Sequence, residues 1–386
     1  MPGRPAHTAT HMHIHGLHRR TITWLALWLA CCAPTAAESL RLPAFFIGDD
    51  VLALTLRDAH GPVELSVAAT ASGESNVGPL ESLTDEGQPP RAFTGTDGKA
   101  DLQMGGIIAV RARDWLVCYG EGMREGYAGN HDAAQLWIDL HAAGQTQPYY
   151  APVVNTDRIE ASWYGVGRRF RVRSGTVTGR ADLIVRALAT DDFRQRALVG
   201  EVEGDVFSGM LKMRSAGPQV EGRGWSVDSR LFLALDARWR ALVTAEGLLG
   251  EIAWEDLRVN DSYLTSPGVF TDVDGFLHQV GGASGAAWHE DLTLRIAPLY
   301  RVELLAATHP AFLCGASYQQ GKMIKPMLGL AWLRSSQALY LRLYPMEKQV
   351  EIGAAGDGWQ LRVASDDWLR GDSSNLSVTL AGTMVW

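Results

Sequence analysis

The chain has 386 residues, of which 46% are hydrophobic, and its mean hydropathy is −0.05. These values exclude an intrinsically disordered chain and a bundle of membrane-spanning helices. The formal charge is −8 and no contiguous block of basic residues occurs, so nucleic acid is not an expected partner. These values do not exclude a membrane β-barrel, because only every second residue of its strands needs to be apolar.

Residues 1–37 have the three parts of a secretory signal. These parts are a charged region with Arg19 and Arg20, an apolar stretch at 22–32 and a small-residue cleavage site at 35–37. The pattern predicts export, followed by a single domain over residues 38–386. A membrane-anchoring helix and a lipoprotein modified at Cys31 or Cys32 are the alternatives, and the apolar stretch is too short to favour the anchor.

The rest of the chain alternates between apolar and polar residues with the two-residue period of β-strands. In the first half the alternation is loose, at 63–67, 106–120, 135–141, 158–175, 207–215, 225–235 and 238–247. Residues 189–206 show a helical pattern instead, with Asp191 or Asp192 as the cap. In the second half the alternation is clear, at 291–298, 300–307, 338–345, 348–354, 358–365 and 376–386. We expect about 14 strands, within limits of about 12 and 16.

The polar positions of these strands hold arginine, carboxylate and tyrosine side chains. If the strands form a barrel, their polar side chains face a lumen, and four arginines then set the polarity of the lumen and any preference for anions. These four are Arg230, Arg295, Arg342 and Arg362. Salt bridges across the lumen to Glu303 and Glu351 are an equally open role. The same mixture would also suit the water-facing surface of a soluble sandwich.

Aromatic residues gather near the ends of the expected strands, at Trp239, Trp288, Tyr300, Trp359, Trp368 and Trp386. Aromatic girdles at the two membrane interfaces are typical of barrels that span a membrane. The alternative is that these rings fill the core of a soluble protein.

The chain ends on "LSVTLAGTMVW", with apolar residues at every second position and an aromatic residue last. The positions that carry the pattern are Val378, Leu380, Met384 and Trp386, and Gly382 departs from it. This segment resembles the last strand of bacterial outer-membrane β-barrels. The resemblance implies that the strand closes the barrel and is an assembly signal, with the barrel assembly machinery and outer-membrane lipid as partners.

A second resemblance covers residues 225–281, with "GWSVDSRLFLALDARWRALVTAEGLLGEIAWEDLRVN" followed by "FTDVDGF". This stretch is similar to a hairpin of the broad fatty-acid-transporter superfamily of outer-membrane barrels, which includes TraF-like and PorV-like proteins. The resemblance implies passage of hydrophobic molecules or service to a secretion system. It covers about one-seventh of the chain and assigns no functional residue.

No motif for catalysis, a metal or a cofactor is present. The segment "GGASGAAW" at 281–288 lacks the spacing of a nucleophilic serine elbow. After the leader only Cys118 and Cys314 remain, and they form either one disulfide or two separate small buried side chains. We therefore predict no catalytic residue, no metal site and no cofactor.

The sequence thus predicts an all-β protein, an antiparallel transmembrane β-barrel of the bacterial outer membrane that is closed by its C-terminal strand. The expected function is a channel, a transporter of hydrophobic molecules whose ligand is unknown, or a scaffold for a secretion complex. A soluble exported β-sandwich that binds a ligand is the first alternative. An outer-membrane hydrolase is the second.

Overall fold

The structure is a computed structural model, and it describes residues 39–42, 50–56, 62–77, 94–141, 147, 149–203, 206–216, 220–271, 277–319, 324–366 and 374–385. The chain forms two compact units, Met1–Ser39 and Leu40–Trp386. The predicted signal at 1–37 and the aromatic residues Trp368 and Trp386 lie outside the described residues. The fold below is that of the second unit.

Strands make up most of this unit. The elements in chain order are β1 (Ser39–Leu40), α2 (Val51–Leu56), β2 (Val63–Ser75), β3 (Asp97–Ala112), β4 (Trp115–Asn130), α3 (His131–His141), β5 (Tyr149–Tyr150), β6 (Val153–Ser174), β7 (Val177–Glu203), β8 (Val206–Ser215), β9 (Gly222–Ala234), β10 (Trp239–Thr271), β11 (Leu277–Ile296), β12 (Leu299–Ala306), β13 (Ala311–Gln319), β14 (Lys325–Arg334), β15 (Gln337–Tyr344), β16 (Gln349–Gly356), β17 (Trp359–Ser365) and β18 (Asn375–Val385). Neither described helix is long and apolar enough to cross a membrane.

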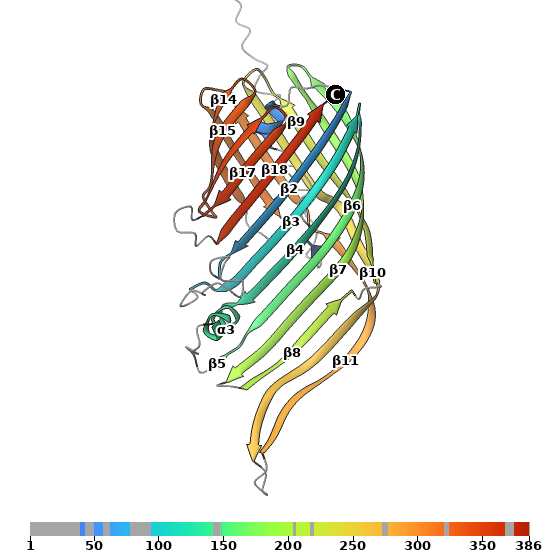
Figure 1. Cartoon of the computed structure of the whole chain (residues 1–386), viewed down its shortest axis with the longest axis vertical. Helices are drawn as coiled ribbons and strands as arrows, with labels where there is room; N and C mark the ends of the chain where they lie inside the picture. Colours follow the sequence, from blue (N-terminus) through green and yellow to red (C-terminus); the bar gives the residue numbers. More distant parts are fainter. Residues whose placement is uncertain are drawn as a thin grey trace, which may run out of the picture. The chain divides into compact units, whose positions relative to one another are not determined.

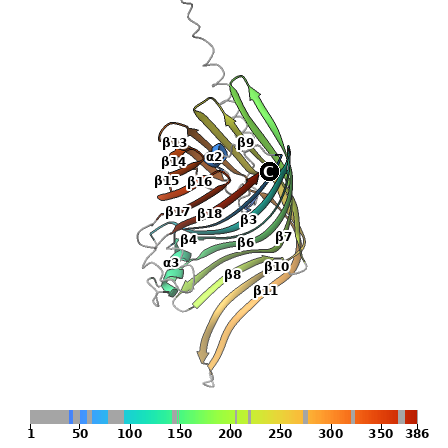
Figure 2. The same ribbon diagram turned by 45° about the horizontal axis from the view of Figure 1, so that its top comes forward.

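The strands form one closed antiparallel barrel of 14 strand positions (Figures 1 and 2). Strands β8 and β9 share one position between β7 and β10, and β11 and β12 share another between β10 and β13. The barrel closes where β18 pairs with β2, from Asn375↔Glu74 to Val385↔Glu64. The predicted fold class, strand number and closure by the C-terminal strand are therefore confirmed, and a soluble β-sandwich is not the fold.

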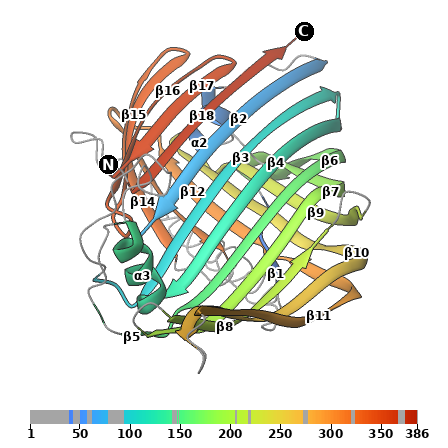
Figure 3. The same cartoon turned by 60° about the horizontal axis from the view of Figure 1, so that its bottom comes forward.

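The two ends of the barrel differ in their connections. At one end, which we call the short-turn end, two-residue turns join strands at 113–114, 175–176, 335–336 and 357–358. Gly175 and Gly358 in these turns have positive φ angles of 60° and 81°, which tight hairpin turns require. The opposite end, the loop end, carries α3 and the long β10–β11 hairpin (Figures 1 and 3).

The outer face of the barrel is apolar around β2–β4, β6–β7 and β13–β18. Along β18, Val378, Leu380 and Met384 are 40%, 58% and 58% exposed, whereas Thr379 and Thr383 between them are buried. Near the short-turn end the exposed side chains include a ring of aromatic groups: Trp115, Phe170, Trp239, Phe312, Trp332 and Trp359. Apolar side chains that point outward from a closed barrel are the pattern of a membrane barrel, not of a soluble core.

The interior of the barrel is apolar over part of its height, whereas the alternation predicted a polar lumen. One cluster of buried side chains lies on the β4–β7 and β10–β11 walls and includes Ile159, Trp163, Ile184, Phe193, Trp254 and Leu294. A second surrounds α2 and includes Leu52, Leu54, Leu242, Leu305, Leu313 and Tyr340. Apolar residues in this chain thus face both outward and inward.

Two local predictions were wrong. Residues 189–206, read as a helix, continue β7 as a strand to Glu203, because they pair with β6 and β8. Residues 135–141, read as a strand, belong to the helix α3. The two cysteines among the described residues, Cys118 and Cys314, are free, and Cys118 on β4 is buried.

Candidate functional site: the barrel interior

The short helix α2 is held inside the barrel by a buried carboxylate. Asp50 accepts a hydrogen bond from the backbone N–H of Ala53 at 2.7 Å, which caps the first turn of the helix. The other carboxylate oxygen accepts hydrogen bonds from Arg342 Nη2 at 2.8 Å and from Gln360 Nε2. Asp50 and Arg342 are 0% and 1% exposed. One side chain therefore starts α2 and fastens it to β15 and β17.

Further polar groups complete this cluster. Arg342 Nη1 donates a hydrogen bond to Glu351 Oε1 at 3.0 Å, and the hydroxyl of Tyr344 donates one to Glu351 Oε2 at 3.2 Å. Burial raises the pKa of Asp50, but the charges of Arg342 and Arg362 outweigh it, so the pKa lies below its ordinary value. Asp50 is therefore ionised at neutral pH, as its contact with a buried guanidinium requires.

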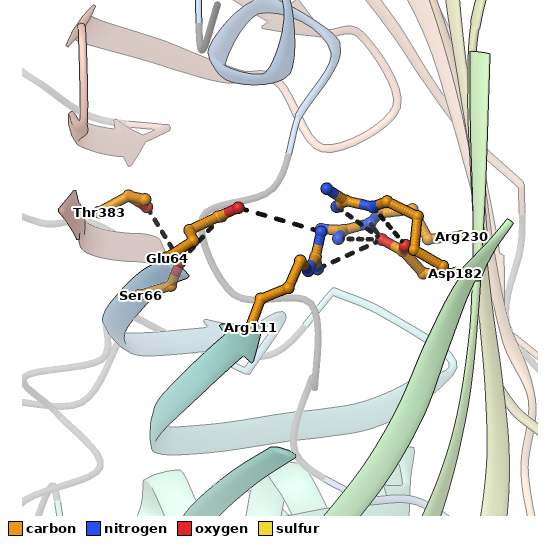
Figure 4. A network of polar contacts seen from close by, with 7 residues as sticks. Glu64, Ser66, Arg111, Asp182, Arg230 and Thr383 are labelled. Carbon is orange, nitrogen blue, oxygen red and sulfur yellow. Dashed lines mark hydrogen bonds and ion pairs between the residues drawn. The ribbon is translucent and has the colours of Figure 1, made fainter. Parts of the chain in front are cut away.

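A second cluster gathers three arginines around one carboxylate on the β2–β3 and β6–β9 walls (Figure 4). Asp182 accepts hydrogen bonds from Arg169 Nε at 2.9 Å and from Arg230 Nε at 3.1 Å. Arg111 Nη2 lies 3.6 Å from the same carboxylate, and its Nη1 lies 4.0 Å from Glu64. Arg111, Arg169 and Arg230 thus gather around Asp182, and Glu64 lies at the edge of this group.

Hydroxyl pairs line the inner side of the seam where the barrel closes. Ser66 Oγ lies 3.1 Å from Thr383 Oγ1, as Figure 4 shows, and Thr70 Oγ1 lies 3.0 Å from Thr379 Oγ1. Each pair joins β2 to β18. Cross-strand pairs of this kind stabilise the junction between neighbouring strands.

The larger apolar cluster contains one charged pair. Arg186 donates two hydrogen bonds to Asp228, at 2.6 Å and 2.8 Å, and its guanidinium lies 5.6 Å from the ring centroid of Trp163. Gly120 leaves the space that Trp163 occupies, because a Cβ there would lie 2.5 Å from the indole ring. This wall therefore packs aromatic and aliphatic side chains around a neutralised ion pair.

Toward the loop end the interior becomes polar and holds a cavity of about 220 Å³. Lys325 on β14 reaches Glu74 on β2 at 2.8 Å, and it also pairs with Glu347. Arg124 pairs with Asp101 at 2.9 Å on the β3–β4 wall. The ion pair between Lys325 and Glu74 therefore joins distant strands across the lumen at this level.

Two of the four arginines predicted for the lumen, Arg342 and Arg362, lie in one cluster. Arg342 is buried in the Asp50 cluster, and Arg362 contributes charge to that cluster. Arg230 is buried beside Asp182. Arg295 is exposed and lies on the opposite face of its strand from the buried Leu294 and Ile296. The role of these arginines in setting selectivity stays a prediction.

Glu351 and Glu303 were the carboxylates predicted to pair across the lumen. Glu351 forms an ion pair with Arg342, and Glu303 lies 4.0 Å from Arg301. Sequence reasoning missed Asp50, Asp182 and Arg186. Asp50 precedes the apolar segment "VLALTL", which is the pattern of a helix N-cap and was available in the sequence. Asp182 and Arg186 had no such local signal, because strand pairing brings their partners to them.

The predicted assembly signal lies only partly within the described residues. Val378, Leu380 and Met384 are on the outer face of β18, whereas Trp386 is outside the described residues. Recognition of this strand by an assembly machinery remains a prediction.

Comparison with known proteins finds distant structural likeness. No protein-family model and no curated protein matches the chain. A mutant of the monoaromatic hydrocarbon channel TodX aligns over 87% of this chain and 94% of its own, with 11% identity and a TM-score of 0.42. The P. putida toluene transporter TodX itself gives 10% identity and a TM-score of 0.42, over 86% and 92% of the two chains. The translocator domain of the autotransporter NalP from Neisseria meningitidis gives 7% identity and a TM-score of 0.33, over 98% and 100%. Likeness this distant carries no argument about cargo.

Proposed function

We propose that this protein is an integral β-barrel of the bacterial outer membrane that lets small hydrophobic molecules pass. The observation that carries the membrane placement is the belt of exposed apolar side chains around a closed barrel, with aromatic side chains at one edge. A water-soluble protein would leave this surface in contact with water at a large cost in free energy. The proposal is for passive passage and not for catalysis.

The connections suggest the orientation of the barrel. Membrane barrels of this class have short turns on the periplasmic side and longer loops outside the cell. The short-turn end, with α2, therefore faces the periplasm. The loop end, with α3 and the β10–β11 hairpin, faces outward. Export by the predicted signal at 1–37 is part of this proposal.

The interior supports hydrophobic cargo. A water-filled pore would have a polar wall throughout, whereas this interior carries the two apolar clusters described above. The indole of Trp163 and the stacked pair Phe193–Trp254, with ring centroids 4.4 Å apart, are buried against other side chains of the interior. They would contact an apolar molecule only when this packing opens. The helix α2 lies in the short-turn half of the interior among buried side chains, so passage requires that it move.

Asp50 holds α2 in place, so substitution of Asp50 tests the proposed channel function. In cells that express the protein, we expect faster uptake of the uncharged aromatic dye phenylnaphthylamine than in cells without it. Asp50→Ala should raise the dye uptake further, and the ion conductance in planar bilayers, because α2 loses its attachment to Arg342 and Gln360. Asp357→Ala, in an exposed turn at the same end, is the matched control and should behave like the wild type.

Uptake equal to that of cells without the protein, for both the wild type and Asp50→Ala, would contradict a channel function. In that case a scaffold role in secretion becomes the better account of the barrel. Conductance that rises in Asp50→Ala without any dye uptake would keep the channel but contradict hydrophobic cargo.

A further inference from the structure

The β6–β7 hairpin at the short-turn end is strongly basic. Residues 161–181 contain five arginines and no acidic residue, in a chain whose formal charge is −8. The arginines are separated by apolar and small residues, so the sequence shows no basic block. Folding brings them together on one hairpin, and Arg111 and Arg230 lie at its base (Figure 4).

The tip of this hairpin extends beyond its neighbour β4. The pairing of β6 with β4 begins at Arg168↔Trp115, and the backbone N–H of Arg169 donates to the carbonyl oxygen of Asp114 in the adjacent turn at 2.7 Å. Residues 170–174 therefore pair with β7 on one side and leave their other edge without a described partner strand.

The two faces of the tip differ in chemistry. Arg171 and Arg173 share a face with Arg169, whose guanidinium meets Asp182 inside the barrel, because alternate residues of a strand lie on one face. The opposite face carries Phe170, which is exposed among the aromatic ring at this end. The basic face, directed to the barrel axis, thus carries Arg169, Arg171 and Arg173. The outward face is aromatic and also holds the exposed Arg168, whose guanidinium lies 5.5 Å and 5.6 Å from the ring centroids of Trp115 and Phe170.

Within the described residues, no carboxylate pairs with Arg171 or Arg173 on this basic face. Arg171 lies directly opposite Arg180, and like charges in this position destabilise a strand pair. Asp182 is already shared by Arg111, Arg169 and Arg230. Arg171 and Arg173 are exposed and form no ion pair with any described residue. Two nitrogens of the buried Arg111 side chain, Nε and Nη1, also have no hydrogen-bond partner within the described ranges.

We propose that this basic face is a docking surface for an acidic, extended segment of a periplasmic protein. Arginine binds carboxylates through paired hydrogen bonds, and Arg171 and Arg173 are spaced like alternate side chains of an extended peptide. The open edge at 170–174 offers backbone groups to such a segment. An anionic lipid headgroup fits less well, because Arg171 and Arg173 share the face of Arg169, which is turned to the barrel axis and away from the membrane.

The test measures binding of fluorescein-labelled decaglutamate by anisotropy, with the whole protein in nanodiscs of zwitterionic lipid. We expect binding to the wild type that weakens as NaCl rises from about 0.05 M to about 0.5 M, since screening shortens the range of these charges. The double variant Arg171→Gln/Arg173→Gln should bind at least about tenfold more weakly. Arg171→Lys/Arg173→Lys should retain part of the affinity, because it keeps the charge but loses the paired hydrogen bonds.

Arg334→Gln at the same end of the barrel and Arg258→Gln toward the loop end are exposed control substitutions and should leave the affinity unchanged. The heat-dependent gel shift checks that each variant is folded. No binding by the wild type, or equal affinity in the wild type and the double glutamine variant, overturns the proposal. If the double variant keeps its affinity for decaglutamate but loses affinity for phosphatidylglycerol vesicles, the surface binds lipid headgroups and the proposal is also wrong.

Discussion

Single charged residues inside the barrel act as connectors between strands that are distant in the sequence. The carboxylate of Asp182 on β7 forms ion pairs with guanidinium groups from β3, β6 and β9. Asp50 connects the start of α2 to β15 and β17. A buried charge is costly unless it is paired, so each of these contacts specifies one arrangement of the elements that it joins.

Removal of Asp182 should destabilise the barrel strongly. Asp182→Ala leaves Arg111, Arg169 and Arg230 close together without the carboxylate that they share, and loss of one partner of a buried pair costs about 3–5 kcal/mol. We expect a lower midpoint temperature for the conversion of the folded to the unfolded band on a gel. Asp191→Ala, an exposed acid on the same strand, should leave the midpoint near the wild-type value. Equal midpoints for the two variants would show that the cluster does not hold these strands together.

At the residue scale, the sequence allowed the polar lining to be predicted on β9, β15 and β17 but not on β11. Arg230, Arg342 and Arg362 alternate with apolar side chains, and so does Arg295. On β11, however, the apolar neighbours Leu294 and Ile296 pack inward in the same cluster as Trp254. The alternation says which residues share a face, but it does not say whether lipid, water or a packed interior meets that face.

At the scale of elements, the strands that close the barrel show the outward-apolar pattern in their described parts, apart from Gly382. Strand β18 is apolar outside and polar or small inside, and its neighbour β17 follows with Trp359 and Leu361 outside and Gln360 inside. The errors occurred where intrinsic preference and tertiary pairing disagree. Residues 189–203 have helix-forming residues, yet two neighbouring strands complete their backbone hydrogen bonds.

A charge on the outer face of β18 should be far more harmful than a charge on its inner face. Leu380→Arg places a guanidinium in hydrocarbon, which costs about 2–4 kcal/mol near the middle of the bilayer. Ser377→Arg, three residues earlier, points into the polar cavity of about 220 Å³ and should be tolerated. Refolding yield into lipid vesicles measures the difference. Equal yields for the two variants would argue against a lipid-facing outer surface.

At the scale of the whole molecule, the sequence allowed the class, the strand number and the closure to be predicted, because a two-residue period and a terminal aromatic pattern are local features. The interior could not be predicted in the same way. Its contents depend on which side chains meet across the lumen, as with Lys325 and Glu74, which are 251 positions apart. The short helix α2 and the apolar clusters around it are consequences of that assembly.

The whole account depends on the medium that the outer face of each strand touches. The direct measurement is the accessibility of nitroxide spin labels placed one at a time from 376 to 384 on β18, in a protein whose Cys118 and Cys314 are replaced, reconstituted in vesicles. We predict that labels at 376, 378, 380 and 384 collide readily with dissolved oxygen and rarely with a water-soluble nickel complex, while labels at 377, 379, 381 and 383 do not share this lipid signature. High nickel accessibility at the first set, or no alternation along the strand, would contradict a barrel whose apolar surface lies in a membrane.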